Sequence, residues 1–458
     1  MNLNVNLKSS ARMPALVGLL VLLARIAAVL PFAPVVAGDS SRYRDPMNPV
    51  SVFEVWTGRG PGVLLQTLFL LPGVWGLIGQ IVVSAALWTA AALLLYAVAH
   101  RYKWIVFGLM MLATLNPWAS IWDSWYLTED VTIAGCVAAA VGGAVFAVGS
   151  RPRVPSLSVA IAGSAAAILA RPYSAVLVLP LLALALLLPP VWRRGMSRRV
   201  LLTGGLVVAA VSLFAVWQVV EFEYIANGGQ IVQVRAAERL GLRGSDPGYL
   251  AVAKAHGMPP CPSLETALTN SATTTQRLTL ARNSTCPGYQ AWLRSGGLSW
   301  ESELLNTPRA TIAAFVHPAY WAAGSVHQYV PYDPRGQWLM AHASPLITPL
   351  SRAINILTYL AGAASIVVAL VVAARSRRRA QVIFTVLALG WIAVFVFIAW
   401  ADTGIETWRH VLPGLYVIGP MCWALTAATS SSSGDSSQSM YEPENRIVSP
   451  VASVAGDL

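Results

Sequence analysis

Long runs of apolar residues alternate with short polar segments along most of the chain. A helix that spans a bilayer needs roughly 20 mostly apolar residues. Runs of this kind lie near residues 14–36, 62–99, 104–121, 131–149, 155–170, 173–191, 200–220, 346–374, 380–400 and 409–428. The second run is long enough for a short re-entrant piece before Pro72 and a span after it. The pattern predicts an all-α polytopic membrane protein with about ten transmembrane helices.

Basic residues cluster in the polar segments on one side of the predicted spans. Cytoplasmic loops of membrane proteins are enriched in Lys and Arg, so this side is predicted to be the cytoplasm, with both termini on it. The acidic residues outside the C-terminal tail all fall on the opposite side, which supports the same orientation. The basic clusters are Lys8/Arg12, Arg101/Lys103, Arg151/Arg153, Arg193/Arg194/Arg198/Arg199 and Arg375/Arg377/Arg378/Arg379.

The overall composition agrees with a location in lipid. The chain is 56% hydrophobic and only 11% charged, with a mean hydropathy of +0.60, which is more apolar surface than a soluble domain of this length buries. The formal net charge of +11 would suit nucleic acid, but the basic residues lie between apolar runs rather than along one face. We therefore expect a lipid bilayer as partner, the plasma membrane as location, and no nucleic acid.

The chain divides into four predicted regions. The longest segment outside the spans has apolar residues at helical spacing, such as Ile231, Val234 and Leu240, interrupted by Pro and Gly. This spacing predicts a small, mixed but mainly helical extracytoplasmic domain that rests on the membrane. The regions are a transmembrane half at 1–220 with an outer loop at 37–60, the loop domain at 221–345, C-terminal transmembrane helices at 346–428, and a disordered cytoplasmic tail at 429–458.

The four cysteines fall into two groups. Cys261 and Cys286 lie in the predicted loop domain, whereas Cys136 and Cys422 lie in predicted spans. An oxidising exterior favours a disulfide between the first two, which would stabilise the domain by roughly 3 kcal/mol in the chain-entropy model. The alternative is that both remain free thiols.

The first candidate for chemistry is Asp39, which follows the first span directly. A carboxylate at this level is able to reach a substrate at the water–lipid boundary and to remove a hydroxyl proton as a general base. The alternative is that Asp39 only caps the end of the helix.

A second acidic segment, residues 122–130, lies between two spans and contains three carboxylates and three aromatic rings. One interpretation is that the acids bind a metal or orient an acceptor while the rings stack on a sugar. The other is that the rings belong to the aromatic belt of the interface, and that the last acids favour the N-terminus of the next helix. The residues are Asp123, Glu129 and Asp130, with Trp122, Trp125 and Tyr126.

Cations at outer span ends form the third group. Arg171 lies between two spans, and Arg409 and His410 begin the last one. Because outward-facing arginines are less expected than inward ones, they require an anionic partner. A lipid-linked phosphate would fit the planar guanidinium group; the alternative is a salt bridge to Asp402, Glu406 or the acids of residues 122–130.

One further arginine, Arg25, lies in the middle of the first predicted span. A charge at this depth is expensive in lipid, so we expect its side chain to face the protein interior or a cavity. The alternative is that the helix tilts and the side chain snorkels to the interface.

The order of these features resembles the GT-C superfamily of polytopic glycosyltransferases, which take a sugar from a polyprenyl-phosphate carrier on the extracytoplasmic face. Arg25 followed by Asp39 and Tyr43 is similar to the family's first-loop acidic motif. The 122–130 segment corresponds to its second acidic turn, and Arg171-Pro172 resembles a cation before a later span. A large outer loop after the seventh span is also typical of the family.

The resemblance implies an inverting glycosyltransferase, with Asp39 as catalytic base and Asp45 as substitute candidate. Donor phosphate would be held by Arg171, Arg409 and His410, and the acceptor hydroxyl would belong to a glycan, lipid or protein of the cell envelope. Ser40 stands where the family often has a second acid, so a divalent cation, Mg²⁺ or Mn²⁺, is left open as cofactor. The side chains expected to stack on substrate are Tyr43, Trp125 and Tyr126.

Two other classes of function fit the same pattern. One is a transporter or flippase of a lipid-linked anion, in which the arginines guide a headgroup and no bond breaks. The other is a non-catalytic scaffold that binds partners through the loop domain. The chain lacks a phosphate-binding Gly-rich Lys loop, a Gly-x-Ser-x-Gly elbow and a His-Glu-x-x-His motif, which disfavours nucleotide-driven transport and the common hydrolases.

Overall fold

A computed structural model describes most of the chain as helix. The described residues are 12–32, 34–35, 62–71, 74–99, 102–116, 121–125, 127–148, 153–187, 198–220, 230–271, 273–295, 299–316, 334–375, 379–402 and 407–438. Within these ranges no extended strand is present, and the one β contact is an isolated parallel bridge between Val35 and Trp125. The chain is thus an all-α membrane protein.

Each predicted span coincides with an apolar helix. Five helices are long and apolar enough to cross a membrane, namely α2, α6, α9, α23 and α24, and the other predicted spans match shorter apolar helical segments. The helices are α2 (Arg12–Val29), α6 (Val74–Val98), α7 (Lys103–Thr114), α9 (Glu129–Val148), α10 (Arg153–Ala170), α11 (Ala175–Leu187), α13 (Arg198–Val220), α22 (Pro334–Arg375), α23 (Arg379–Asp402) and α24 (Thr407–Gln438).

Three helix boundaries refine the predicted pattern. The second apolar run forms two helices, because the short α5 (Val63–Phe69) ends before α6 begins, as the position of Pro72 suggested. Helix α22 begins at Pro334, inside the predicted loop domain, and α24 continues to Gln438, inside the segment predicted to be disordered. An established helix propagates into neighbouring polar residues more easily than a new helix nucleates.

Helix α9 is the centre of the bundle, and every one of its side chains is buried. It packs against α10 with almost no space between the two backbones. A Cβ atom added to Gly142 would lie 2.5 Å from the Ala160 nitrogen, and one added to Gly163 would lie 2.5 Å from the Ala139 nitrogen. Small residues allow this close approach, which is a common way for helices to associate in lipid.

The helices at the periphery of the bundle expose large apolar side chains. Such surfaces are unfavourable in water but suit the acyl chains of a bilayer. The exposed residues include Leu16, Leu19, Leu20 and Leu23 on α2, Ile105 and Leu112 on α7, Leu206 and Leu213 on α13, and Ile383, Val386 and Leu387 on α23.

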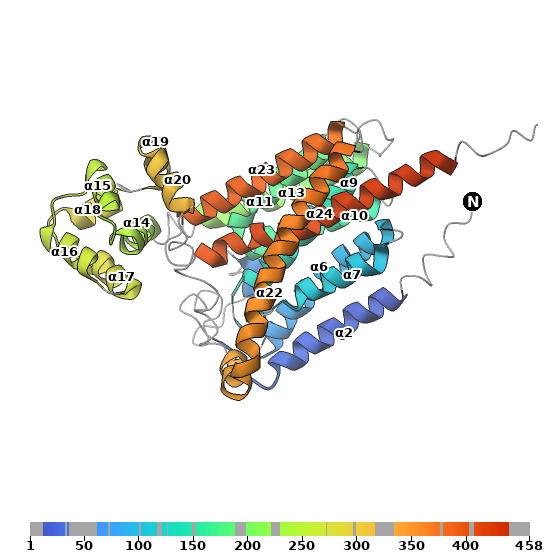
Figure 1. Ribbon diagram of the computed structural model, residues 1–458, viewed down its shortest axis with the longest axis horizontal. Helices are drawn as coiled ribbons and strands as arrows, with labels where there is room; N and C mark the ends of the chain where they lie inside the picture. Colours follow the sequence, from blue (N-terminus) through green and yellow to red (C-terminus); the bar gives the residue numbers. More distant parts are fainter. Residues whose placement is uncertain are drawn as a thin grey trace, which may run out of the picture.

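The loop domain is a cluster of short helices beyond one end of the bundle (Figure 1). Its own hydrophobic core contains Leu240, Leu264, Leu268, Tyr289 and Trp292. Burial raises the pKa of the Tyr289 phenol, whose hydroxyl donates to the Ala281 carbonyl. The helices are α14 (Gln230–Arg243), α15 (Pro247–Ala255), α16 (Pro262–Asn270), α17 (Thr274–Asn283), α18 (Tyr289–Arg294), α19 (Trp300–Asn306) and α20 (Pro308–Val316).

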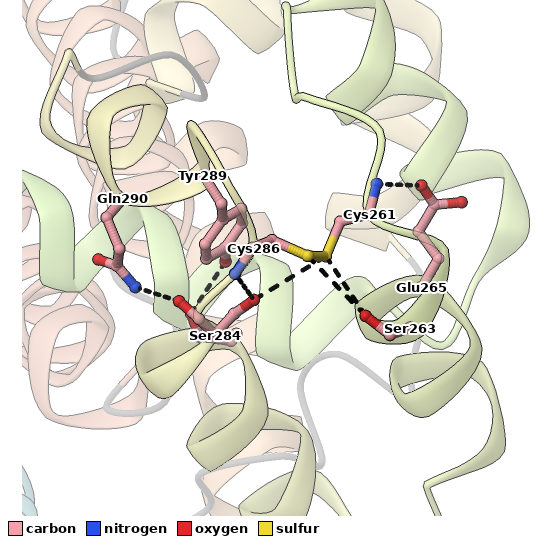
Figure 2. The surroundings of a disulfide bond; sticks show 8 residues. Cys261, Ser263, Glu265, Ser284, Cys286, Tyr289 and Gln290 are labelled. Atoms are coloured by element: carbon pink, nitrogen blue, oxygen red, sulfur yellow. Dashed lines mark hydrogen bonds between the residues drawn. A yellow bond between two sulfur atoms is a disulfide. The ribbon is translucent and has the colours of Figure 1, made fainter.

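A disulfide joins Cys261 and Cys286, the two cysteines of this domain (Figure 2). Their Cα atoms lie 6.0 Å apart, a separation typical of disulfides. The bond links the start of α16 to the turn before α18, and Cys261 is fully buried. Cys136 and Cys422 are buried free thiols inside membrane helices.

Helix α14 connects the loop domain to the membrane bundle through a buried charge. The Arg243 guanidinium carbon lies 4.3 Å from the centre of the Trp400 ring, at the end of α23. Its Nη1 donates to Glu303 Oε2 at 2.9 Å, and the Tyr249 hydroxyl donates to the other oxygen of Glu303 at 2.7 Å. Burial raises the pKa of Tyr249, and the Glu303 carboxylate raises it further.

Candidate functional site

Arg25 faces the interior of the bundle and is almost completely buried, so the expectation from the sequence is confirmed. Its Nε donates to Asp123 Oδ2 at 3.0 Å, and its Nη2 donates to the other oxygen of Asp123 and to Asp130 Oδ1 at 2.7 Å. Its Nη1 donates to the Ser84 hydroxyl at 3.1 Å, which donates in turn to Asp130 at 2.6 Å. One guanidinium group therefore holds two buried carboxylates.

A second buried cluster forms around Glu129, whose side chain has no exposed surface. Glu129 Oε1 accepts from Arg409 Nε at 2.6 Å and from Arg171 Nη1 at 3.2 Å. The Nη2 of Arg171 lies 2.9 Å from the nearer ring nitrogen of His410. Segments far apart in the chain thus meet at one carboxylate.

The two clusters share the first turn of α9, since Glu129 and Asp130 are its first two residues. Acids at this position interact favourably with the positive end of the helix dipole. The Arg25 cluster has one guanidinium against two carboxylates, and the Glu129 cluster has two guanidiniums against one carboxylate. The excess charges are opposite in sign and adjacent, so each cluster offsets part of the excess charge of the other.

Two segments that are distant in sequence meet at the short 3-10 helix η2 (Ile121–Ser124). Val35, at the end of the segment that follows α2, forms the bridge to Trp125 directly after η2. Arg335, at the start of α22, donates from Nη2 to the Ile121 carbonyl at 3.0 Å. Val35 precedes Asp39 by only four positions and is the last described residue before the loop that contains Asp39.

The predicted site residues divide into two sets. Asp39, Tyr43, Asp45 and Tyr126 lie outside the described residues. Trp125 is buried and packs edge-on against Trp122, with 6.0 Å between ring centroids. The described charged residues all join the two clusters: Asp123 and Asp130 around Arg25, and Arg171, Arg409 and His410 around Glu129.

Of the partners considered for Arg171 and Arg409, Glu129 of the 122–130 segment binds both, while the side chains of Asp402 and Glu406 lie outside the described part of the chain. The Arg171 side chain keeps 14% of its surface exposed, whereas Glu129 keeps none. Glu129 therefore orients both guanidinium groups, and Arg171 and His410 are the partly accessible members of the cluster.

Ser84 and Gln80 are members of the Arg25 cluster that the sequence reasoning missed. They lie one helical turn apart on α6, and the Gln80 amide donates to the Trp122 carbonyl at 3.0 Å. The Gln80 carbonyl oxygen and Asp130 Oδ2 are buried without a hydrogen-bond partner among the described residues. The sequence feature that indicates their role is the occurrence of two polar residues at helical spacing within an apolar run. Polar groups in a membrane helix require hydrogen-bond partners inside the protein.

The described residues do not form an obvious metal centre. Within the described ranges, no three His, Cys, Asp or Glu side chains are arranged to hold a metal ion. Asp123 and Asp130 both bind Arg25, which already neutralises part of their charge.

No protein-family model, no curated protein and no solved structure matches this chain. The likeness to GT-C glycosyltransferases depends on the order of charged residues and spans alone. The function is therefore inferred from the geometry of the chain's own residues.

Proposed function

We propose that the protein is a membrane glycosyltransferase that moves a sugar from a polyprenyl-phosphate donor to an acceptor hydroxyl at the extracytoplasmic face. The supporting observation is the pairing of Glu129 with both Arg171 and Arg409. It brings cations from two distant segments to Glu129, four residues after Trp125, which forms the bridge to Val35 in the segment that leads to Asp39. A base and an anion-binding group at one membrane surface are what this reaction needs.

The proposed base is Asp39, with Asp45 as the substitute. The acceptor oxygen would attack the anomeric carbon of the donor sugar and form the new glycosidic bond. The bond between this carbon and the phosphate oxygen would break, and its electron pair would stay on the phosphate. Asp39 would take the proton from the acceptor hydroxyl. A single displacement of this kind inverts the configuration at the anomeric carbon.

The proposed phosphate-binding group consists of Arg171, Arg409 and His410. Departure of polyprenyl phosphate requires stabilisation of the negative charge that grows on the leaving oxygen. Glu129 neutralises only one of the two guanidinium groups, so the cluster retains positive charge. Because Glu129 also holds both groups in position, they need little reorganisation when the anion arrives.

The acids around Arg25 are proposed to act by positioning the outer loops. Asp123 is held by Arg25 and follows Trp122, whose carbonyl accepts from Gln80. This network fixes the turn against which Val35 forms its bridge. Tyr43 and Tyr126 remain the proposed stacking residues for the sugar, whereas Trp125 is buried against Trp122 and contributes to the packing of this turn.

The assay for this proposal uses the purified full-length protein in vesicles that contain a polyprenyl-phosphate sugar. Asp39→Asn removes the base with little change in volume, and Asp45→Asn is the matched control in the same loop. We expect Asp39→Asn to lose at least about 100-fold in transfer, as is common for a missing general base, while donor binding and thermal unfolding stay unchanged.

Three other outcomes are informative. Loss in Asp45→Asn alone would transfer the role of base to Asp45. Unchanged transfer in both variants would remove both residues from the mechanism, and lipid translocation without sugar transfer would favour a flippase instead. Transfer that disappears with a chelator and returns with Mg²⁺ or Mn²⁺ would identify the divalent cation as a cofactor.

A further inference from the structure

Helix α20 exposes an almost entirely apolar surface. Ile312 is 53% exposed and Val316 is 67% exposed, and the only charged side chain of the helix is the exposed Arg309 in its first turn. A soluble domain normally turns a polar face to water. The exposed side of α20 carries no charged side chain other than Arg309. This surface is therefore better suited to lipid than to water.

Contacts on the buried side of α20 define its position along the membrane helix α23. The Phe315 ring packs edge-on against Phe397 and Trp400, with centroid distances of 5.1 and 5.2 Å. These two rings belong to the last turns of α23, a helix apolar enough to cross a membrane. Because α23 ends at Asp402, α20 lies at the height where α23 leaves the apolar layer.

The helix against which α20 packs also exposes apolar side chains. Val394, one turn before Phe397 on α23, is 44% exposed. Figure 1 shows α20 at the end of α23, between the bundle and the helices α14 to α18. Among the described residues, exposed apolar side chains are therefore present both on α23 and on α20, which packs against it.

The position of α20 is also held from the loop domain. Glu303, on the helix directly before α20, binds Arg243, whose guanidinium group stacks on the same Trp400 ring that Phe315 contacts. Arg243 and Phe315 thus both contact Trp400 at the end of α23, and these contacts hold α20 at this level.

We propose that α20 is an interfacial helix bound to the phospholipid leaflet on the side of the loop domain. Ile312 and Val316 lie among the upper acyl chains, and Arg309 lies at the level of the phosphate headgroups. Amphipathic helices bind membranes in this way, with an apolar side in the headgroup–acyl boundary and cations beside anionic lipid. The loop domain is then anchored to the membrane independently of any catalytic activity.

The test places an environment-sensitive fluorophore on α20 in the full-length protein, reconstituted in phosphatidylcholine–phosphatidylglycerol vesicles. The labelled variants are Ile312→Cys and Val316→Cys, and the control is Lys254→Cys, on the partly exposed surface of α15. Unmodified protein measures background labelling, because its two free cysteines are buried and the other two are bonded.

We expect lipids brominated near the top of the acyl chains to quench the Ile312 and Val316 labels at least twofold more strongly than the Lys254 label. Aqueous iodide should show the reverse order. Strong iodide quenching at positions 312 and 316 would overturn the proposal, because it would place α20 in water. Quenching by neither agent would also overturn it, because a second protein surface would then cover the helix.

Discussion

Glu129 and Asp130 are consecutive residues whose carboxylates join different arginines. Glu129 accepts from Arg409 and Arg171, whereas Asp130 accepts from Arg25 and Ser84. The first turn of α9 therefore links four separate segments of the chain. This turn is the point at which the charged groups of the bundle meet.

Substitution of these neighbours by their amides gives a matched pair. Glu129→Gln leaves the buried Arg409 and the partly exposed Arg171 without their carboxylate, so we expect a loss of about 3–5 kcal/mol in the free energy of unfolding. Asp130→Asn leaves Arg25 paired with Asp123, so the expected loss is about 1–2 kcal/mol. Thermal unfolding in detergent measures both. Equal losses would show that the two clusters are not electrostatically distinct.

Removal of the Arg25 charge should destabilise the bundle strongly. Arg25→Met keeps most of the side-chain volume but leaves Asp123 and Asp130 as uncompensated buried anions, with an expected loss of about 3–5 kcal/mol. Arg12→Met, on an exposed position of the same helix, should change stability by less than about 0.5 kcal/mol. A triple variant that also carries Asp123→Asn and Asp130→Asn should recover part of the loss, because no unpaired anion remains. Failure of this recovery would argue against charge compensation as the cause.

The close approach of α9 and α10 makes two adjacent glycines unequal. A methyl group at Gly142 would meet the Ala160 and Ser156 backbones at 2.5 and 2.6 Å, whereas one at Gly143 would meet only the Ala185 side chain at 3.7 Å. Gly142→Ala should therefore cost roughly 1–3 kcal/mol through overpacking. Gly143→Ala should be neutral or stabilising by up to about 1 kcal/mol, because alanine favours the helix. Their melting temperatures in detergent provide the comparison.

Reduction of the disulfide should loosen the loop domain without disrupting the bundle. The bond closes a segment with a sequence separation of 25, so its loss is expected to cost roughly 3 kcal/mol of the domain's stability. Limited proteolysis of the full-length protein, with and without reductant, should show faster cleavage between residues 230 and 316 after reduction. A Cys261→Ser/Cys286→Ser variant should be cleaved rapidly under both conditions. If reductant accelerates cleavage of this variant as well, another site is responsible.

Several parts of the site were predictable from local chemistry. Arg25 was expected to face inward because lipid penalises an exposed charge, and the Arg25 contacts agree. The choice between phosphate and carboxylate as the partner of Arg171 and Arg409 was not predictable from the sequence. Both anions accept paired hydrogen bonds from a guanidinium group. The roles of Ser84 and Gln80 were not predicted, because their partners Arg25 and Trp122 are distant in sequence and contact them only in the folded chain.

The sequence by itself determined where the membrane helices lie. A helix that spans a bilayer needs about 20 consecutive apolar residues. Each span is therefore visible in the sequence as a long apolar run. Only the tertiary structure decided which carboxylate pairs with which arginine. Electrostatic attraction depends on distance in space, and Glu129 and Arg409 are 280 residues apart in sequence but 2.6 Å apart in the fold.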